Sequence, residues 1–188
     1  MKNLNKEYLY VWACDFSKSR GEGLLARNFL NNCLKYTKKK FIINGISYPN
    51  FINKDIQIRT GLLHNYLYPF IGVFKIWKEH LANKKTIYLN YLPLWNFLIF
   101  LLLPKNTILG PITGGSYYSN SSSFSFFIRR YIFPLFFSIS LIIIRKKYNK
   151  VLFSTNLLKK YIKNKENFTF NYSLNIYHEN KYIKSKKN

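Results

Sequence analysis

The hydrophobic positions of this chain fall into short apolar runs that alternate with longer segments of helical spacing. The first run, from Tyr8 to Cys14, is apolar and aromatic, and a helical pattern from Gly23 to Tyr36 follows it. The alternation continues along the chain. The other expected strands are Phe41 to Ile43, Ile56 to Ile58, Thr86 to Leu89, Thr107 to Leu109, Val151 to Phe153 and Phe168 to Phe170. The other expected helices are Tyr66 to Leu81, Pro93 to Leu103, Phe124 to Lys147 with a break at Pro134, and a short one through Ile162 that Thr155 or Asn156 caps.

Strands that alternate with helices are typical of an α/β fold in which helices cover both faces of a parallel sheet. The chain has 188 residues, which is enough for one good core. We therefore expect one Rossmann-like domain over residues 1–175, with a basic tail or the start of a linker over 176–188. Residues 45–55 are expected to form a loop. No G-x-G-x-x-G motif follows the first strand, so a dinucleotide cofactor is not expected.

The segment from Thr107 to Gly115 predicts a strand, a tight glycine loop and then a long helix. Glycine lets the backbone adopt positive φ and lets a ligand approach it closely. In an open parallel sheet, ligands bind at the loops that follow the carboxyl ends of the strands. The alternative is an ordinary turn. The candidate substrate-binding residues of this loop are Gly110, Pro111, Thr113, Gly114 and Gly115.

A second candidate loop, Arg20-Gly21-Glu22-Gly23, lies between the first strand and the first helix. The N-terminus of a helix offers unpaired N–H groups and the positive end of a dipole, which together favour an anion. Arg20, Gly21 and Gly23 are therefore candidate substrate-binding residues. Glu22 is a candidate catalytic residue, because its carboxylate can accept a hydrogen bond from a sugar hydroxyl or act as a base. The alternative is that Glu22 caps the helix.

Three further polar residues follow predicted strands. Asn90 and Tyr91 stand at the end of the fourth strand and are candidate substrate-binding residues, or else they start a turn before Pro93. His64 precedes a predicted helix and is a candidate catalytic residue, although a lone histidine is more often a helix cap or a packing residue. Two cysteines and scattered acids give no metal-binding pattern, so no metal site is expected.

The composition is strongly basic, with 30 Lys and Arg against 7 Asp and Glu and a formal net charge of +23. Such a surface attracts nucleic acid or an anionic membrane. The aromatic residues fall in apolar runs and are not interleaved with Lys and Arg, so nucleic acid is not an expected partner. No secretory signal is apparent at the N-terminus, which favours the cytoplasm.

Two uncharged stretches raise the question of a membrane span, Thr86 to Pro104 and Tyr131 to Ile144. Asn and Pro interrupt the first. The second reaches about 21 Å as a helix, short of the ~30 Å hydrocarbon core. Arg129-Arg130 and Arg145-Lys146-Lys147 flank it, and basic residues at both ends favour a helix that lies on an anionic surface. The alternatives are a helix buried in the fold and a spanning helix.

Three segments together resemble the N-terminal half of bacterial GT-B glycosyltransferases, in particular the retaining enzymes that build lipopolysaccharide, capsule and O-antigen. They are CDFSKSRGEGLLARNFL, TIYLNYLPLWNFLIFLLLPKNTILGPITGG and KVLFSTNLL, and the resemblance covers Tyr8 to Tyr172. It implies that the domain binds an acceptor and that its first glycine loop approaches the phosphate of a nucleotide-sugar co-substrate. It also implies that a second domain grips this donor and that no metal or other cofactor is needed.

The chain departs from this family in two respects. Many relatives carry a histidine near the transferring sugar where this chain has Asn90-Tyr91, and we expect no donor-binding domain within these 188 residues. We therefore expect an acceptor-binding half, incomplete as an isolated enzyme, that acts peripherally at the inner face of the cell membrane on a lipid-linked or glycan acceptor. A missing or separate chain would bind the donor. The alternatives are a non-catalytic subunit that recruits a donor-binding partner to the membrane and a small integral membrane protein.

Overall fold

The computed structural model describes residues 8–19, 21–37, 39–47, 62–90, 92–113, 127–149, 151–155, 159 and 168–169, with only the backbone described at 62–66, 129 and 168–169. Its centre is a five-stranded sheet in the order β3-β2-β1-β4-β5. Four strands run parallel, and β3 pairs antiparallel with β2 at one edge. The strands are β1 (Tyr8–Trp12), β2 (Lys40–Ile43), β3 (Ile46–Ser47), β4 (Lys85–Tyr88) and β5 (Ile108–Leu109).

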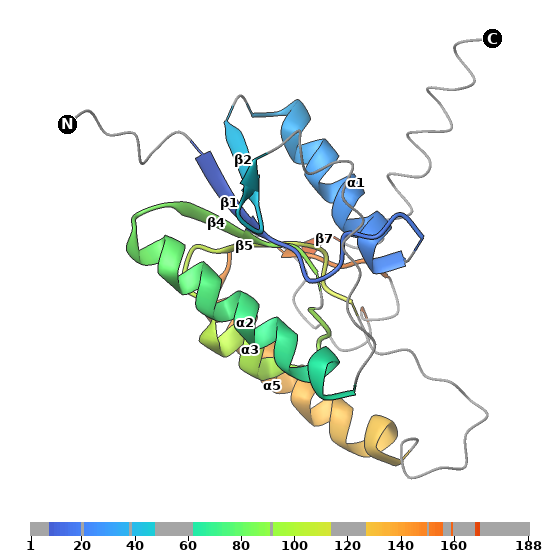
Figure 1. Ribbon diagram of the computed structural model, residues 1–188. Helices are drawn as coiled ribbons and strands as arrows, with labels where there is room; N and C mark the ends of the chain where they lie inside the picture. The colour runs from blue at the N-terminus through green and yellow to red at the C-terminus, as the bar shows by residue number, and fades with distance from the viewer. Residues whose placement is uncertain are drawn as a thin grey trace.

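Helices cover both faces of this sheet, so the expected α/β class with a Rossmann-like arrangement is confirmed (Figure 1). Of the helices in the described ranges, α1 (Gly21–Lys35) covers one face. The other face carries what we term the helical layer. It consists of α2 (Leu62–Leu81), α3 (Phe97–Leu102), the π-helical turn η2 (Ile128–Ile132) and α5 (Phe133–Lys147).

Two hydrophobic cores follow from the alternation of side chains along the strands. Leu9 and Val11 of β1 point toward α1 and pack with its buried Phe29. Tyr10 and Trp12 point the opposite way and pack against the helical layer. That second core also includes Val73, Ile76, Ile99, Phe100, Phe137, Leu141 and Ile144 from the helices. Within the described part of the chain, no helix combines the length and the apolarity that crossing a bilayer requires.

The antiparallel edge strand was not expected, because residues 45–55 were predicted to be a loop. Asn44 and Gly45 both have positive φ, 50° and 88°, and they turn the chain so that Ile46–Ser47 pairs back onto β2. An Asn-Gly pair between apolar residues is a strong hairpin signal, because two-residue hairpin turns need positive φ at both positions. The prediction was therefore wrong at Ile46 and Ser47, and the central sheet is mixed.

The expectation that Val151 to Phe153 belongs to the central sheet is also wrong. Strand β6 (Val151–Leu152) pairs parallel with β7 (Phe168–Thr169) in a separate two-stranded sheet. One isolated bridge, between Ile112 and Phe153, connects this small sheet to the segment that follows β5. The ladder of β5 ends after two residues because Gly110 and Pro111 follow it and proline cannot donate a ladder hydrogen bond.

Three helix boundaries differ from those expected. Helix α2 begins at Leu62, which places His64 inside its first turn. Helix α3 begins only at Phe97, because Leu92 to Leu94 pairs with Thr113 in extended conformation. The expected break at Pro134 is a π-helical turn that leads directly into α5. Proline lacks an N–H and crowds the carbonyl four residues earlier, and a wider turn relieves that contact. The predicted strand from Ile56 to Ile58 lies outside the described residues, as does nearly all of the helix predicted from Asn156.

Candidate functional site

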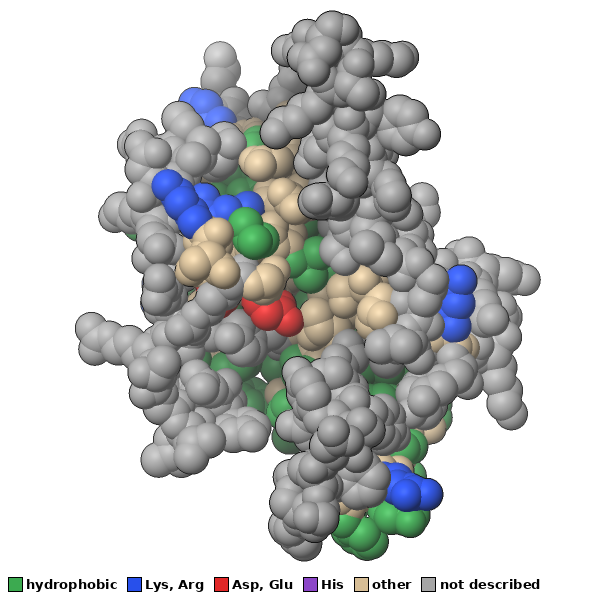
Figure 2. Space-filling view, turned by 90° about the vertical axis from the view of Figure 1, so that its right-hand side faces the viewer, with side chains coloured by type: hydrophobic (Ala, Val, Ile, Leu, Met, Phe, Trp, Pro, Cys, Tyr) green, Lys and Arg blue, Asp and Glu red, His purple; other side chains and the backbone are tan. Residues whose placement is uncertain are grey.

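The candidate site lies at what we term the carboxyl edge, where β1, β4 and β5 end. Figure 2 faces this edge, and acidic side chains are visible near its centre. The β1–α1 loop, the residues after β4 and Gly110 after β5 all meet there, because parallel strands end at the same side of a sheet. Gly21–Gly23 and Gly110 therefore lie at one edge of the sheet.

The side-chain amide of Asn90 clamps the β1–α1 loop. Its Oδ1 accepts hydrogen bonds from the backbone N–H groups of Cys14 at 2.8 Å and of Asp15 at 3.2 Å. Its Nδ2 donates to the backbone carbonyls of Asp15 and, at 3.3 Å, of Glu22. Asn90 is only 1% exposed. These bonds occupy both the donor and the acceptor atoms of the amide, so Asn90 positions the loop and has little capacity left for a ligand.

Helix α1 holds the same loop from the other side. The Arg27 guanidinium donates from Nε to the Phe16 carbonyl at 2.9 Å and lies 4.3 Å from the centre of the Phe16 ring. The loop residues Asp15, Phe16 and Ser17 are all buried. Asn90, which follows β4, and Arg27 on α1 thus fix a loop that has no regular secondary structure of its own.

Asp15 is the functional candidate that sequence reasoning missed. Its carboxylate is fully buried, and Oδ1 accepts the Ser17 N–H at 2.8 Å. Its other oxygen, Oδ2, is buried and has no hydrogen-bond partner among the described residues. An unsatisfied buried carboxylate oxygen is costly and marks a place where a ligand can supply the missing donor. The signal in the sequence was its position, directly after the first strand at the edge where ligands bind.

The two glycines of the Gly-Glu-Gly motif have different surroundings. A Cβ on Gly23 would meet the Ser17 backbone N and O at 2.4 Å each, so this glycine lets the loop pack directly on the helix. A Cβ on Gly21 would meet nothing within 4 Å, and Gly21 is exposed. The space expected for a ligand is therefore at Gly21, whereas Gly23 is required by packing. Glu22 lies between them in the first turn of α1, where a negative charge also complements the helix dipole.

This contrast gives a first prediction. Gly23→Ala should destabilise the protein by about 2–3 kcal/mol, because its methyl group collides with backbone that cannot move away easily. Gly21→Ala should stay within about 0.5 kcal/mol of wild type. Urea unfolding of both variants measures the difference. Equal midpoints for the two variants would contradict the packing role of Gly23.

The Gly110 segment is not the tight loop that was expected. A Cβ on Gly110 would lie 1.9 Å from the carbonyl oxygen of Leu89, so this glycine is required by the close approach of the β4 end and not by positive φ. Pro111 is buried. Thr113 pairs through its backbone, accepting from Leu94 N at 2.9 Å and donating to Leu92 O at 3.1 Å. These residues therefore shape the carboxyl edge.

Several predicted site residues cannot be placed. Arg20, Tyr91, Gly114 and Gly115 lie outside the described residues. His64 has its backbone in the first turn of α2, and its side chain is outside the described part. In the described ranges, no three His, Cys, Asp or Glu side chains are grouped so as to hold a metal ion.

Cys14 lies at the same edge but is not a nucleophile. Burial, with smaller contributions from the nearby Glu22 and Asp15 carboxylates, raises the pKa of its thiol to about 12. The sulfur contacts Trp12 Nε1 at 3.4 Å and the Tyr88 hydroxyl at 3.5 Å, inside the core under the helical layer. The thiol therefore stays protonated at neutral pH, and Cys14 is a packing residue.

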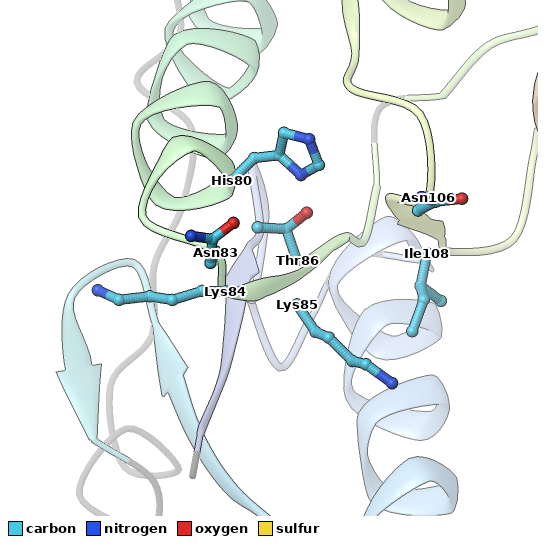
Figure 3. A pocket seen from close by; sticks show the side chains of 7 residues that line it. All are labelled: His80, Asn83, Lys84, Lys85, Thr86, Asn106 and Ile108. Atoms are coloured by element: carbon cyan, nitrogen blue, oxygen red, sulfur yellow. The ribbon is translucent and has the colours of Figure 1, made fainter. Parts of the chain in front are cut away.

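A cavity of about 470 Å³ lies at the edge of the sheet opposite the carboxyl edge, where β4 and β5 begin (Figure 3). Lys84 and Lys85 contribute to its lining, but their side chains diverge. Lys84 is also paired with Glu79 of α2. Cations that point apart and are partly neutralised do not converge on one ligand. The carboxyl edge, with its buried carboxylate and open helix N-terminus, remains the better candidate site.

Comparisons with protein-family models, with curated proteins and with solved structures found no match to this chain. The fold defines its class, an α/β domain with a mostly parallel sheet between helices.

Proposed function

We propose that this chain is the acceptor-side domain of a glycosyltransferase and binds a sugar hydroxyl at the carboxyl edge. The observation that carries the proposal is the buried Asp15 carboxylate, with one oxygen bonded to Ser17 and the other without a partner among the described residues. A sugar offers hydroxyl donors, and a carboxylate is a strong acceptor for them. Gly21, at the exposed N-terminus of helix α1, leaves room for the rest of such a ligand.

In this proposal Asp15 orients the acceptor hydroxyl, and Glu22 supplies a second carboxylate from the first turn of α1. Asn90 and Arg27 hold the loop in place. Positioning an acceptor supplies proximity, while stabilisation of the leaving phosphate requires a donor-binding chain. The domain alone should therefore neither bind a nucleotide-sugar tightly nor transfer sugar. Turnover by the purified chain at about 1 per second, an ordinary enzymatic rate, would contradict this proposal.

Binding of acceptor glycans to the chain alone tests the site. We expect a panel of free oligosaccharides to include one that shifts the backbone NMR signals of Asp15, Ser17 and Gly21. Asp15→Asn keeps the bond from Ser17 but loses the charge, and it should weaken that binding about tenfold, the value of one charge-assisted hydrogen bond.

Glu79→Gln is the matched control, because Glu79 is an acid on α2 that is paired with Lys84 near the opposite edge. It should leave glycan binding unchanged. Shifts that cluster away from the β1–α1 loop, or equal effects of the two substitutions, would count against the site. A panel in which no oligosaccharide binds would refute the acceptor role.

The proposal extends to location, which we place at the inner face of the cell membrane. The support is the exposure of Arg130 at the start of the η2–α5 segment and of Arg145 and Lys146 at its end. Each basic residue near an anionic surface contributes about 1 kcal/mol, and less at high salt. Peripheral association would bring the carboxyl edge to a lipid-linked acceptor.

A second candidate function is a non-catalytic subunit that recruits a donor-binding partner to the membrane. Asn90 favours it, because the place where the resemblance implies a histidine near the transferring sugar holds an amide that clamps the backbone. Reconstitution with a donor-binding chain separates the two functions. If the chain is the acceptor-side domain, replacing Glu22 or Asp15 would abolish sugar transfer. If it is a recruiting subunit, the same replacements would leave transfer intact.

A further inference from the structure

The helical layer is apolar on both of its sides. Its inner side packs on the sheet through Val73 and Ile76 of α2 and through Phe137 of α5, among others. Its outer side also carries large apolar side chains, each between 41% and 74% exposed. We term this outer side the apolar face. It comprises Leu67, Ile71, Phe74, Trp77 and Leu81 of α2, Leu98, Leu101 and Leu102 of α3, Tyr131, Leu135 and Ile142 of the η2–α5 segment, and Phe127 directly before that segment.

The spacing on α2 shows that this exposure is organised. Leu67, Ile71 and Phe74 stand at intervals of four and three residues and therefore form one stripe along the helix. Tyr131, Leu135 and Ile142 form a corresponding stripe on the η2–α5 segment. The three helices lie side by side on one face of the sheet (Figure 1), so the stripes belong to one surface. Contiguous apolar surface of this extent is unusual on a soluble monomer and marks an interaction site.

The charges on these helices identify the kind of partner. Each stripe continues into an exposed lysine near the C-terminal end of its helix, Lys78 on α2 and Lys146 on α5. Lys75, Arg130 and Arg145 add exposed cations. Glu79 is the one acidic side chain in the described parts of the helical layer, and it is paired with Lys84. An apolar surface bordered by cations complements the acyl chains and phosphates of an anionic bilayer.

We propose that the apolar face inserts into the headgroup and acyl boundary of an anionic bilayer, with α2 and α5 lying parallel to the membrane plane. This inference rests on the membrane association proposed above but not on sugar transfer. Two copies joined through this face would bring cations against cations, which disfavours a dimer. In the proposed insertion, burial of the apolar face supplies most of the affinity for the bilayer, and the cations supply the rest.

Vesicle flotation of the full chain tests the insertion. The vesicles contain phosphatidylcholine and phosphatidylglycerol in equal parts, with pure phosphatidylcholine for comparison. Ile71→Gln with Phe74→Gln should lower partition to the mixed vesicles more than tenfold, because both side chains lose their apolar burial. Arg145→Gln with Lys146→Gln should lower it about tenfold or more on the mixed vesicles only. Leu24→Gln, at a comparably exposed leucine on α1, should have no effect.

Depth of insertion gives an independent readout. A nitrobenzoxadiazole label on Phe74→Cys, in a Cys33→Ser background, should shift to shorter wavelength on vesicles and be quenched by nitroxide-bearing lipids. The same label on Tyr36→Cys, at the end of α1 on the other side of the sheet, should show neither change. Cys14 is buried and should not be labelled.

The outcomes separate this inference from the association on which it rests. Wild-type chain that binds neither kind of vesicle refutes both. High salt shortens the screening length to about 3 Å. If this abolishes binding, and if the Gln substitutions on α2 leave binding unchanged, the association is electrostatic and occurs without insertion. A dimer in solution that dissociates on Phe74→Gln, without vesicle binding, shows that a second copy covers the face. Either of the last two results overturns the inference.

Discussion

Gly110→Ala is expected to destabilise the protein by about 3 kcal/mol, at the upper end of what overpacking costs. A Cβ at this position would lie 1.9 Å from the carbonyl oxygen of Leu89 and 2.7 Å from its carbonyl carbon. Both atoms belong to backbone at the end of β4, which the buried sheet holds in place. To relieve the overlap between the alanine methyl group and Leu89, the ends of β4 and β5 would have to separate. The hydrogen bond from Gly110 N to Tyr88 O, at 2.8 Å, would then be lost.

Gly45→Ala is the matched control for this substitution. Gly45 has a φ of 88° but open space around its Cα, so alanine there meets backbone strain of about 1–2 kcal/mol without a collision. Urea unfolding with an unchanged slope should place Gly110→Ala well below Gly45→Ala in stability. The opposite order would mean that conformational strain, and not close approach of the strands, explains the glycine after β5.

Asn90→Ala should cost about 3–5 kcal/mol of unfolding free energy. The substitution leaves the N–H groups of Cys14 and Asp15 buried without their acceptor and removes the donor to the Asp15 carbonyl. Each unsatisfied buried group costs about 1–3 kcal/mol. Thermal or urea unfolding measures the loss. Hydrogen exchange at the amides of Cys14 and Asp15 should accelerate in the same variant.

Asn96→Ala is the control for Asn90→Ala. Asn96 occupies the N-cap position of α3 but makes no capping hydrogen bond through its side chain. Its replacement should change stability by no more than about 0.5 kcal/mol. Asn90→Asp refines the test, because a carboxylate retains the acceptor but cannot donate to the Asp15 carbonyl. If Asn90→Ala unfolds at the wild-type urea concentration, the clamp does not hold the loop.

Elements with long, regular patterns were predictable from sequence. The strands from Tyr8 and Thr86 and the helix from Gly23 occur within a few residues of their expected bounds, since a buried face requires a repeated apolar spacing. Local pairing was less predictable. The extended stretch from Leu92 to Leu94 is fixed by hydrogen bonds to Thr113, which is distant in sequence. The Asn44-Gly45 pair is a hairpin signal in the sequence, but the surrounding residues have the composition of a loop, and a loop was therefore predicted.

The position of the candidate site in the fold could be predicted from sequence, but the structural roles of its residues could not. The carboxyl edge follows from strand order, and the Gly-Glu-Gly and Gly-Pro motifs indicated it. Sequence could not show that Gly23 and Gly110 are needed by close backbone contacts, or that Asn90 is occupied by the loop. Such roles depend on which backbone atoms approach each residue in three dimensions. Asp15 was missed for the same reason, because its burial depends on packing by α1 and β4.

The end of β1 is held on both flanks by side-chain amides in place of neighbouring strands. Asn44 bonds to the N–H and the C=O of Ala13 at 2.9 and 2.8 Å, and Asn90 bonds to the two residues that follow. The backbone that leads to the Asp15 carboxylate has therefore lost its conformational entropy during folding. A ligand that bonds to Asp15 meets a group already in position, so little of the binding free energy is spent on ordering the loop.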